Sequence, residues 1–147
     1  MMKNRQKNIL LASSTKLFDS LGTLLKQSGF NVAKCKDGAQ ALELALKGSP
    51  EIMIVDTGIS VLGADKLVQI LRANSKTDLS SIFFVGPEGE QIEGFRHQVD
   101  RYIPRPFNDE QLLAEILTHF NRKEKSEQLG QARTEVEGDL KQISLPD

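Results

Sequence analysis

Short apolar runs alternate with amphipathic stretches along most of this sequence, and this alternation constrains the fold more than any other feature. The clearest run is Ile52-Met53-Ile54-Val55, which is apolar at every position, as in a strand that is covered on both faces. Residues 9–12 and 82–85 form similar runs, and residues 32–35 and 102–103 form weaker ones. Runs of this length predict buried strands rather than helices.

Helical patterns separate these predicted strands. Apolar residues recur at helical spacing in four segments, with stripes formed by Leu17, Phe18, Leu21, Leu24 and Leu25; by Ala41, Leu42, Ala45 and Leu46; by Leu67, Val68 and Leu71; and by Leu112, Leu113, Ile116, Leu117 and Phe120. Between the fourth and fifth strands, glycines and Pro87 leave space for only a short, poorly formed helix. Strands joined through helices run parallel, with right-handed crossovers. We therefore predict an α/β, flavodoxin-like, doubly wound sheet of five parallel strands in the order 2-1-3-4-5, with helices on both faces.

The pattern also predicts the organisation of the chain. Residues 1–7 form an N-terminal tail, residues 8–121 form one domain, and residues 122–147 are a polar linker. In the linker, Leu129 and Val136 lie a heptad apart, and two positions do not establish a coiled coil. This segment is either an extension of the last helix or a solvated linker.

Charge and composition exclude several classes of function. The chain has 19 Lys and Arg against 20 Asp and Glu, which gives no electrostatic reason to expect nucleic acid or an anionic membrane as a partner. No apolar run approaches the roughly 20 residues needed to cross a bilayer. Cys35 is the single cysteine, so the chain cannot form an internal disulfide. We expect a cytoplasmic protein.

Asp56 is the one carboxylate placed directly after a predicted buried strand. In a doubly wound sheet, reactive groups gather beyond the carboxyl ends of the strands. The other strand ends carry Ser13-Ser14, Gly86 and Arg105-Pro106. Asp56 is therefore either the centre of a functional site or a simple loop cap.

Three segments in register carry a family resemblance. Residues 52–56, ending in Asp56, resemble the third strand of the receiver domain of two-component response regulators, the CheY-like family, which ends in a phospho-accepting aspartate. Residues 102–107 resemble its fifth-strand motif, an aromatic followed by Lys-Pro-Phe, and residues 37–42 resemble the start of its second helix. The resemblance covers residues 8 to about 121 and implies the same fold.

The departures from this family bear on function. Ser13 and Ser14 occupy the positions of its usual acidic pair, Gly86 that of its switch Thr or Ser, and Arg105 that of its lysine. Tyr102 and Pro106 match the family, and Ser60 stands where a proline is usual. The resemblance therefore implies a phospho-acceptor position at Asp56 with most of its partners replaced.

These replacements weaken the predicted phosphorylation chemistry. Receiver phosphorylation needs Mg²⁺, which prefers an octahedral oxygen shell rich in carboxylates. Asp56 with two hydroxyls supplies a formal charge of -1 instead of -3. At ~4 Å and an effective dielectric of ~20, each missing charge removes roughly 4 kcal/mol of attraction before solvent compensates. We therefore expect no metal, no cofactor and no enzymatic activity, with Mg²⁺ relevant only to a working phospho-switch.

Arg105 leaves two interpretations open, because a guanidinium can bind a carboxylate or a phosphate. We favour a permanent ion pair with Asp56. The Arg105–Pro106 bond is expected to be cis, as is the matching bond in the family. We expect Ser13 and Ser14 to cap the first helix rather than to bind a ligand.

The sequence therefore favours a degenerate pseudo-receiver that binds a protein partner. The expected surface combines the fourth helix, the fifth strand and the fifth helix, including Tyr102, parts of residues 90–98 and residues 109–120. A histidine kinase and a fused output domain are the partners that the resemblance implies. The alternatives are a working switch phosphorylated on Asp56 by a histidine kinase, and a small-ligand site at the same sheet edge. Residues 136–147 resemble the opening of a PATAN domain, which implies a truncated second domain.

Overall fold

The computed structural model describes the backbone of residues 6–89 and 98–143, and side chains as far as residue 126. Strands and helices alternate along it, in the order β1 (Asn8–Ala12), α1 (Asp19–Gln27), β2 (Asn31–Cys35), α2 (Gly38–Gly48), β3 (Ile52–Asp56), α3 (Ala64–Arg72), β4 (Ser81–Pro87), β5 (Arg101–Arg105) and α4 (Asp109–Ile143). The predicted short helix before the fifth strand lies largely at residues 90–97, outside the described residues.

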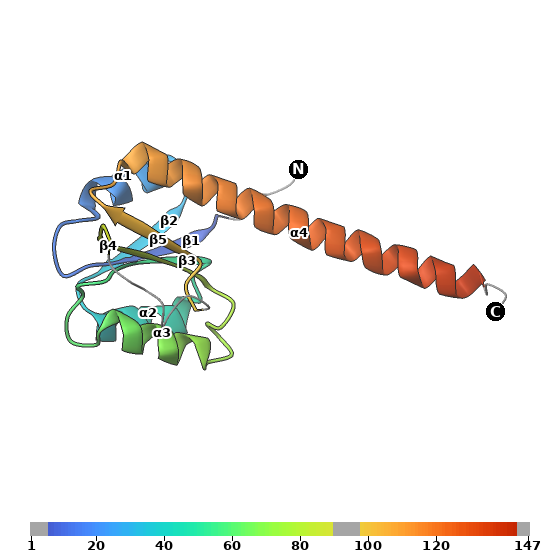
Figure 1. Ribbon diagram of the computed structural model, residues 1–147, viewed down its shortest axis with the longest axis horizontal. Helices are drawn as coiled ribbons and strands as arrows, with labels where there is room; N and C mark the ends of the chain where they lie inside the picture. Colours follow the sequence, from blue (N-terminus) through green and yellow to red (C-terminus); the bar gives the residue numbers. More distant parts are fainter. Residues whose placement is uncertain (1–5, 90–97, 144–147) are drawn as a thin grey trace. The chain divides into compact units, whose positions relative to one another are not determined.

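The strands form one parallel sheet in the order β2-β1-β3-β4-β5 (Figure 1). This is the order predicted from the sequence. The chain crosses from one half of the sheet to the other between β2 and β3, so β1 and β3 are the neighbours at the switch point. Every residue of β3 is buried, which confirms that its continuous apolar run belongs to a central strand.

Helices cover both faces of the sheet. Figure 1 shows α1 on one face and α2 with α3 on the other. Because strand side chains alternate between faces, Leu10, Met53 and Ile82 belong to the core cluster beneath α2 and α3. That cluster also takes Ala41 from α2 and Leu67 from α3. The predicted apolar stripes of these two helices therefore face the core.

Local interactions fix the loop between β2 and α2. The Asp37 side chain caps α2 by accepting a hydrogen bond from Gln40 N at 2.8 Å. The Gly38 N–H donates to Ser60 O at 3.0 Å, and a Cβ at Gly38 would lie 1.8 Å from Leu62 O. Only glycine fits here, so the β2–α2 loop can lie directly against the β3–α3 loop.

The chain divides into two compact units, Met1–Asp109 and Glu110–Asp147. The second unit consists of α4 after its first residue, and this helix continues to Ile143. Leu112, Ile116 and Phe120 are buried, whereas residues 121–126 are exposed. The segment that the sequence left open as a helix extension or a linker is helical as far as Ile143. No described helix is both long enough and apolar enough to cross a membrane.

Candidate functional site

Asp56 lies at the carboxyl end of β3, between β1 and β4. Its side chain is buried, with 4% of the residue exposed. Both carboxylate oxygens accept hydrogen bonds: Oδ2 from Ser13 Oγ at 2.8 Å, and Oδ1 from Gly58 N at 2.9 Å. A buried carboxylate needs such donors, because an unsatisfied charge away from water is costly.

Ser13 is the described residue whose side chain hydrogen-bonds to Asp56. Its backbone N–H donates to Cys35 O at 3.1 Å, which carries the β1–β2 pairing one residue past Ala12. Its hydroxyl donates to Asp56 and accepts a hydrogen bond from Thr15 N at 3.1 Å. The Thr15 hydroxyl lies 3.0 Å from the same oxygen. Ser13 is therefore a buried partner of the carboxylate.

The expectation that Ser13 and Ser14 cap the first helix is wrong. The helix begins at Asp19, its N-cap residue is Phe18, and no side chain makes a cap hydrogen bond there. The physical reason is that both hydroxyls are used elsewhere: Ser13 bonds Asp56, and Ser14 joins neighbouring loops.

Ser14 connects three loops at this edge of the sheet. Its hydroxyl donates to Lys36 O at 2.8 Å, in the β2–α2 loop. In the β3–α3 loop it accepts from Ser60 N at 3.1 Å and lies 2.9 Å from Ser60 Oγ. Sequence reasoning did not assign this role to Ser60. The one signal was the serine at a position where the family usually has proline, because only a residue with an N–H can donate to Ser14.

Arg105 does not pair with Asp56. Among the residues that the structure describes, no ion pair or hydrogen bond joins them, so the favoured prediction is wrong. Asp56 of β3 pairs with Val85 of β4, and Val85 pairs with Ile103 of β5. Arg105 is therefore two strands away from β3 and two residues beyond the position that lies opposite Asp56. Ordinary sheet spacing then separates the two Cα atoms by about 12 Å. Ser13 and Gly58 lie closer and already occupy the carboxylate.

Arg105 instead lines a hollow of about 810 Å³. Glu88, Phe107 and Asp109 also line it. The Arg105–Pro106 peptide bond is cis, as predicted. The last of the replaced positions, Gly86, is buried in β4 opposite Pro104 and presents no side chain to the site.

Tyr102 lies on β5 and is half-buried against the core cluster beneath α2 and α3. Its hydroxyl donates a hydrogen bond to Pro87 O at 2.7 Å, at the end of the neighbouring strand. Of the other residues expected at the partner surface, residues 90–97 lie outside the described part of the chain. Tyr102, Gln98 and Asp109 are therefore its described members in the first unit.

The negative charge at this edge is sparse. Within residues 6–89 and 98–126, no group of three or more His, Cys, Asp or Glu side chains could hold a metal ion. Burial, together with the negative charge of Asp37, raises the pKa of the nearby Cys35 thiol to about 11. Cys35 therefore stays protonated at neutral pH and supplies no thiolate ligand.

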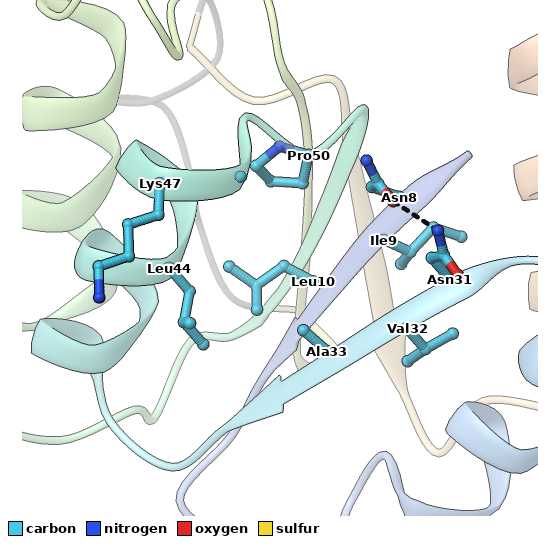
Figure 2. A pocket seen from close by; sticks show the side chains of 10 residues that line it. Asn8, Ile9, Leu10, Asn31, Val32, Ala33, Leu44, Lys47 and Pro50 are labelled. Carbon is cyan, nitrogen blue, oxygen red and sulfur yellow. Dashed lines mark hydrogen bonds between the residues drawn. The ribbon is translucent and has the colours of Figure 1, made fainter. Parts of the chain in front are cut away.

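A separate hollow of about 490 Å³ lies at the opposite ends of the strands (Figure 2). Asn8 and Asn31 begin β1 and β2, and the Asn31 side-chain amide donates to Asn8 Oδ1 at 3.1 Å. Leu44 and Lys47 of α2 form the other wall. Because this hollow is at the amino ends of the strands, it is not part of the Asp56 site.

A five-stranded parallel sheet with one buried aspartate at the carboxyl end of β3 defines an α/β fold of the doubly wound class. The chain belongs to the response regulator receiver domain family, whose model matches residues 13–117.

Relatives and solved structures agree with this assignment. The chain is 32% identical over 122 residues to the transcriptional regulatory protein CpxR of Escherichia coli, covering 83% of this chain and 52% of CpxR. It is 24% identical over 135 residues to the DNA-binding response regulator MtrA of Mycobacterium tuberculosis, covering 90% of this chain and 59% of MtrA. The chain thus spans little more than half the length of these relatives.

Two solved structures show the shared fold. The chemotaxis response regulator CheY4 of Vibrio cholerae aligns with a TM-score of 0.72 at 22% identity, covering 78% of this chain and 98% of that one. A CheY-like receiver domain protein of Methanospirillum hungatei aligns with a TM-score of 0.74 at 18% identity, covering 83% and 99%.

Proposed function

We propose that this receiver domain is a pseudo-receiver, which binds a protein partner without a cycle of phosphorylation at Asp56. The observation that carries the proposal is the state of the Asp56 carboxylate. Ser13 and Gly58 donate to its two oxygens, and no cation pairs with it among the described residues. Each oxygen keeps a second lone pair, so what the site lacks is the nearby positive charge that would offset an approaching phosphoryl group.

The donors around Asp56 do not fit Mg²⁺. The ion would meet one carboxylate and two hydroxyls, whereas it prefers several charged oxygen ligands. The Ser13 proton points at Asp56, and an oxygen lone pair of Ser13 accepts from Thr15 N. The Ser14 oxygen is engaged by Lys36 and Ser60. A metal at this position would have to break these bonds, so no step of the proposed function runs through one.

The proposed partner is a protein that contacts the surface around Tyr102. In this proposal the domain has no enzymatic activity, needs no cofactor and works in the cytoplasm on a protein rather than on nucleic acid. The relatives CpxR and MtrA are named as a transcriptional regulatory protein and a DNA-binding response regulator. Because this chain spans about half of each, we also propose that it is the receiver part of a regulator with a fused output region.

Intact-mass measurement tests the proposal directly. The chain is mixed with acetyl phosphate and Mg²⁺, and we expect no added phosphate. Asp56→Asn serves as the control. A phosphate that appears on the natural chain and disappears in Asp56→Asn would establish the alternative, a working phospho-switch at Asp56.

A gain-of-function variant shows whether the assay can detect phosphorylation in this fold. Ser13→Asp combined with Ser14→Asp restores two carboxylates beside Asp56. We expect this variant to bind Mg²⁺ and to gain mass from acetyl phosphate. If both chains gained phosphate to the same extent, the natural chain would be a working phospho-acceptor without its acidic pair, and the proposal would fail.

A further inference from the structure

A third hollow lies directly beside Ser13, on the β1–β2 side of the Asp56 site. Its volume is about 690 Å³. Its lining comes from the β1–α1 loop, the start of α1, β2 and the β2–α2 region. The polar members are three lysines (Lys16, Lys34, Lys36), Asp19, Gln40 and the hydroxyls of Ser13, Ser14 and Thr15.

The charge of this lining is positive. Lys34 is neutralised by Asp19, whose Oδ1 lies 3.1 Å from its ammonium. Lys16 and Lys36 are exposed, and neither ammonium has an ion-pair partner within the described part of the chain. Asp37 and Asp56 lie close by and keep their negative charges, but neither lines the hollow: Asp37 caps α2, and Asp56 is buried and bonded to Ser13.

The two unpaired lysines are carried on loops that are tied together. Ser14 donates to the carbonyl of Lys36 at 2.8 Å, and Lys16 follows Ser14 by two residues. Thr15 N and Leu17 N turn inward to the hydroxyls of Ser13 and Thr15. Alternate N–H groups in this loop, those of Ser14 and Lys16, have no acceptor among the described residues. Backbone N–H groups without an acceptor can add to the attraction of nearby ammonium groups for an anion.

We propose that this hollow binds a phosphate monoester. A phosphate dianion matches two ammonium groups and two N–H donors, for which Lys acts as a point charge. The hollow is much larger than a phosphate ion, which favours a phosphate carried on a larger body. This inference rests on the proposed function in one respect, because it requires that no metal occupies the neighbouring Asp56 edge.

The replacement of the acidic pair is what makes this ligand chemistry accessible. With carboxylates at positions 13 and 14, the loop would repel an anion and attract a cation. With serines there, Lys16 and Lys36 dominate the exposed charge. The same substitutions that remove ligands for a metal cation therefore favour the binding of an anion.

An NMR titration of the full 147-residue chain tests the site. Backbone amide shifts are followed at constant ionic strength as inorganic phosphate, or a peptide with one phosphoserine, is added. We expect saturable shifts at Ser14, Thr15, Lys16 and Lys36. Lys16→Gln and Lys36→Gln should each weaken binding by roughly three- to tenfold. Lys26→Gln removes an equal charge from an exposed lysine of α1 outside the hollow, and it should leave binding unchanged.

The results distinguish the two sources of the phosphate. They also distinguish a failure of the phosphate site from a failure of the pseudo-receiver proposal. Tighter binding of the phosphopeptide than of free phosphate, with no binding of the unphosphorylated peptide, identifies a partner's phosphorylated side chain; equal binding of free phosphate and phosphopeptide identifies the free ion. Shifts that do not saturate, or a Lys26→Gln variant weakened as much as Lys16→Gln, would overturn the site. Covalent phosphate on Asp56 in the mass experiment would overturn the pseudo-receiver without affecting this titration, because inorganic phosphate does not phosphorylate a carboxylate.

Discussion

The two edges of the sheet differ in how their cationic side chains are bonded. At the amino ends of the strands, Arg72 is bonded throughout: it donates to Gln98 O and Asp78 O at 2.8 Å, to Ser80 O at 2.5 Å and to Asp100 Oδ2 at 3.2 Å. At the carboxyl ends, Lys16, Lys36 and Arg105 make no ion pair among the described residues. Arg72 uses four of its five N–H donors within the fold, whereas the unpaired cations at the other edge are available to a ligand or partner.

Loss of Arg72 should have the largest effect. Arg72→Met removes a donor from three backbone carbonyls and leaves Asp100 Oδ2 with the Ile82 N–H, and we expect it to lower the free energy of unfolding by about 2–4 kcal/mol. Arg105→Met removes an equal charge from the carboxyl edge and should change it by less than about 0.5 kcal/mol. Urea denaturation followed by circular dichroism measures both. Equal losses would remove the contrast between the two edges.

Ser13→Ala should have the next largest effect. Among the described residues, the substitution leaves the buried Asp56 carboxylate with Gly58 N as its single donor, and we expect a loss of about 1–2 kcal/mol. Ser28→Ala is the matched control, because its exposed hydroxyl donates to Leu24 O on the surface of α1. The same denaturation experiment compares them. If Ser13→Ala matched Ser28→Ala, Asp56 would not depend on its serine partner.

Val61 offers a stabilising change. This β-branched residue has φ of 72° and is 79% exposed, so it combines backbone strain with little packing. Val61→Asn suits the left-handed conformation, and we expect a gain of about 1 kcal/mol. Leu79→Asn, at a residue that is 82% exposed and has an ordinary φ, should be close to neutral. A melting temperature unchanged by Val61→Asn would contradict stored strain at the carboxyl edge.

Ionisation of Cys35 should have the smallest effect on the free energy of unfolding at neutral pH and a measurable effect at alkaline pH. Because burial raises its pKa from 9.0 to about 11, the folded state favours the protonated thiol. The unfolded chain ionises first, so this contribution is complete below pH 9 and is lost as the pH rises from 9 to 11. The difference in unfolding free energy between the natural chain and Cys35→Ala should therefore shrink over that range. A constant difference would show that the thiol is not shielded.

Sequence patterns were sufficient for the fold and for the position of Asp56, because both depend on local order. The run Ile52–Val55 followed by Asp56 can be buried only in a central strand, and strand–helix alternation then leaves few topologies. The partners of Asp56 were not predictable in the same way. Ser13 is 43 residues from Asp56 in sequence, and its hydroxyl could equally have capped a helix. Arg105 was expected at Asp56 because a guanidinium can bind a carboxylate, but nearer neutral donors occupy the carboxylate instead.

The hydrogen bond from Tyr102 to Pro87 O bears on how the domain would be regulated. If an aromatic ring alternates between two positions, only the molecules with the ring in the right position can bind the partner. The apparent affinity for the partner is then reduced in proportion to that fraction of molecules. A ring held by its hydroxyl in one position offers the whole population. For such a domain, the amount of protein in the cell would set the occupancy of its partner, and regulation would act through synthesis and turnover.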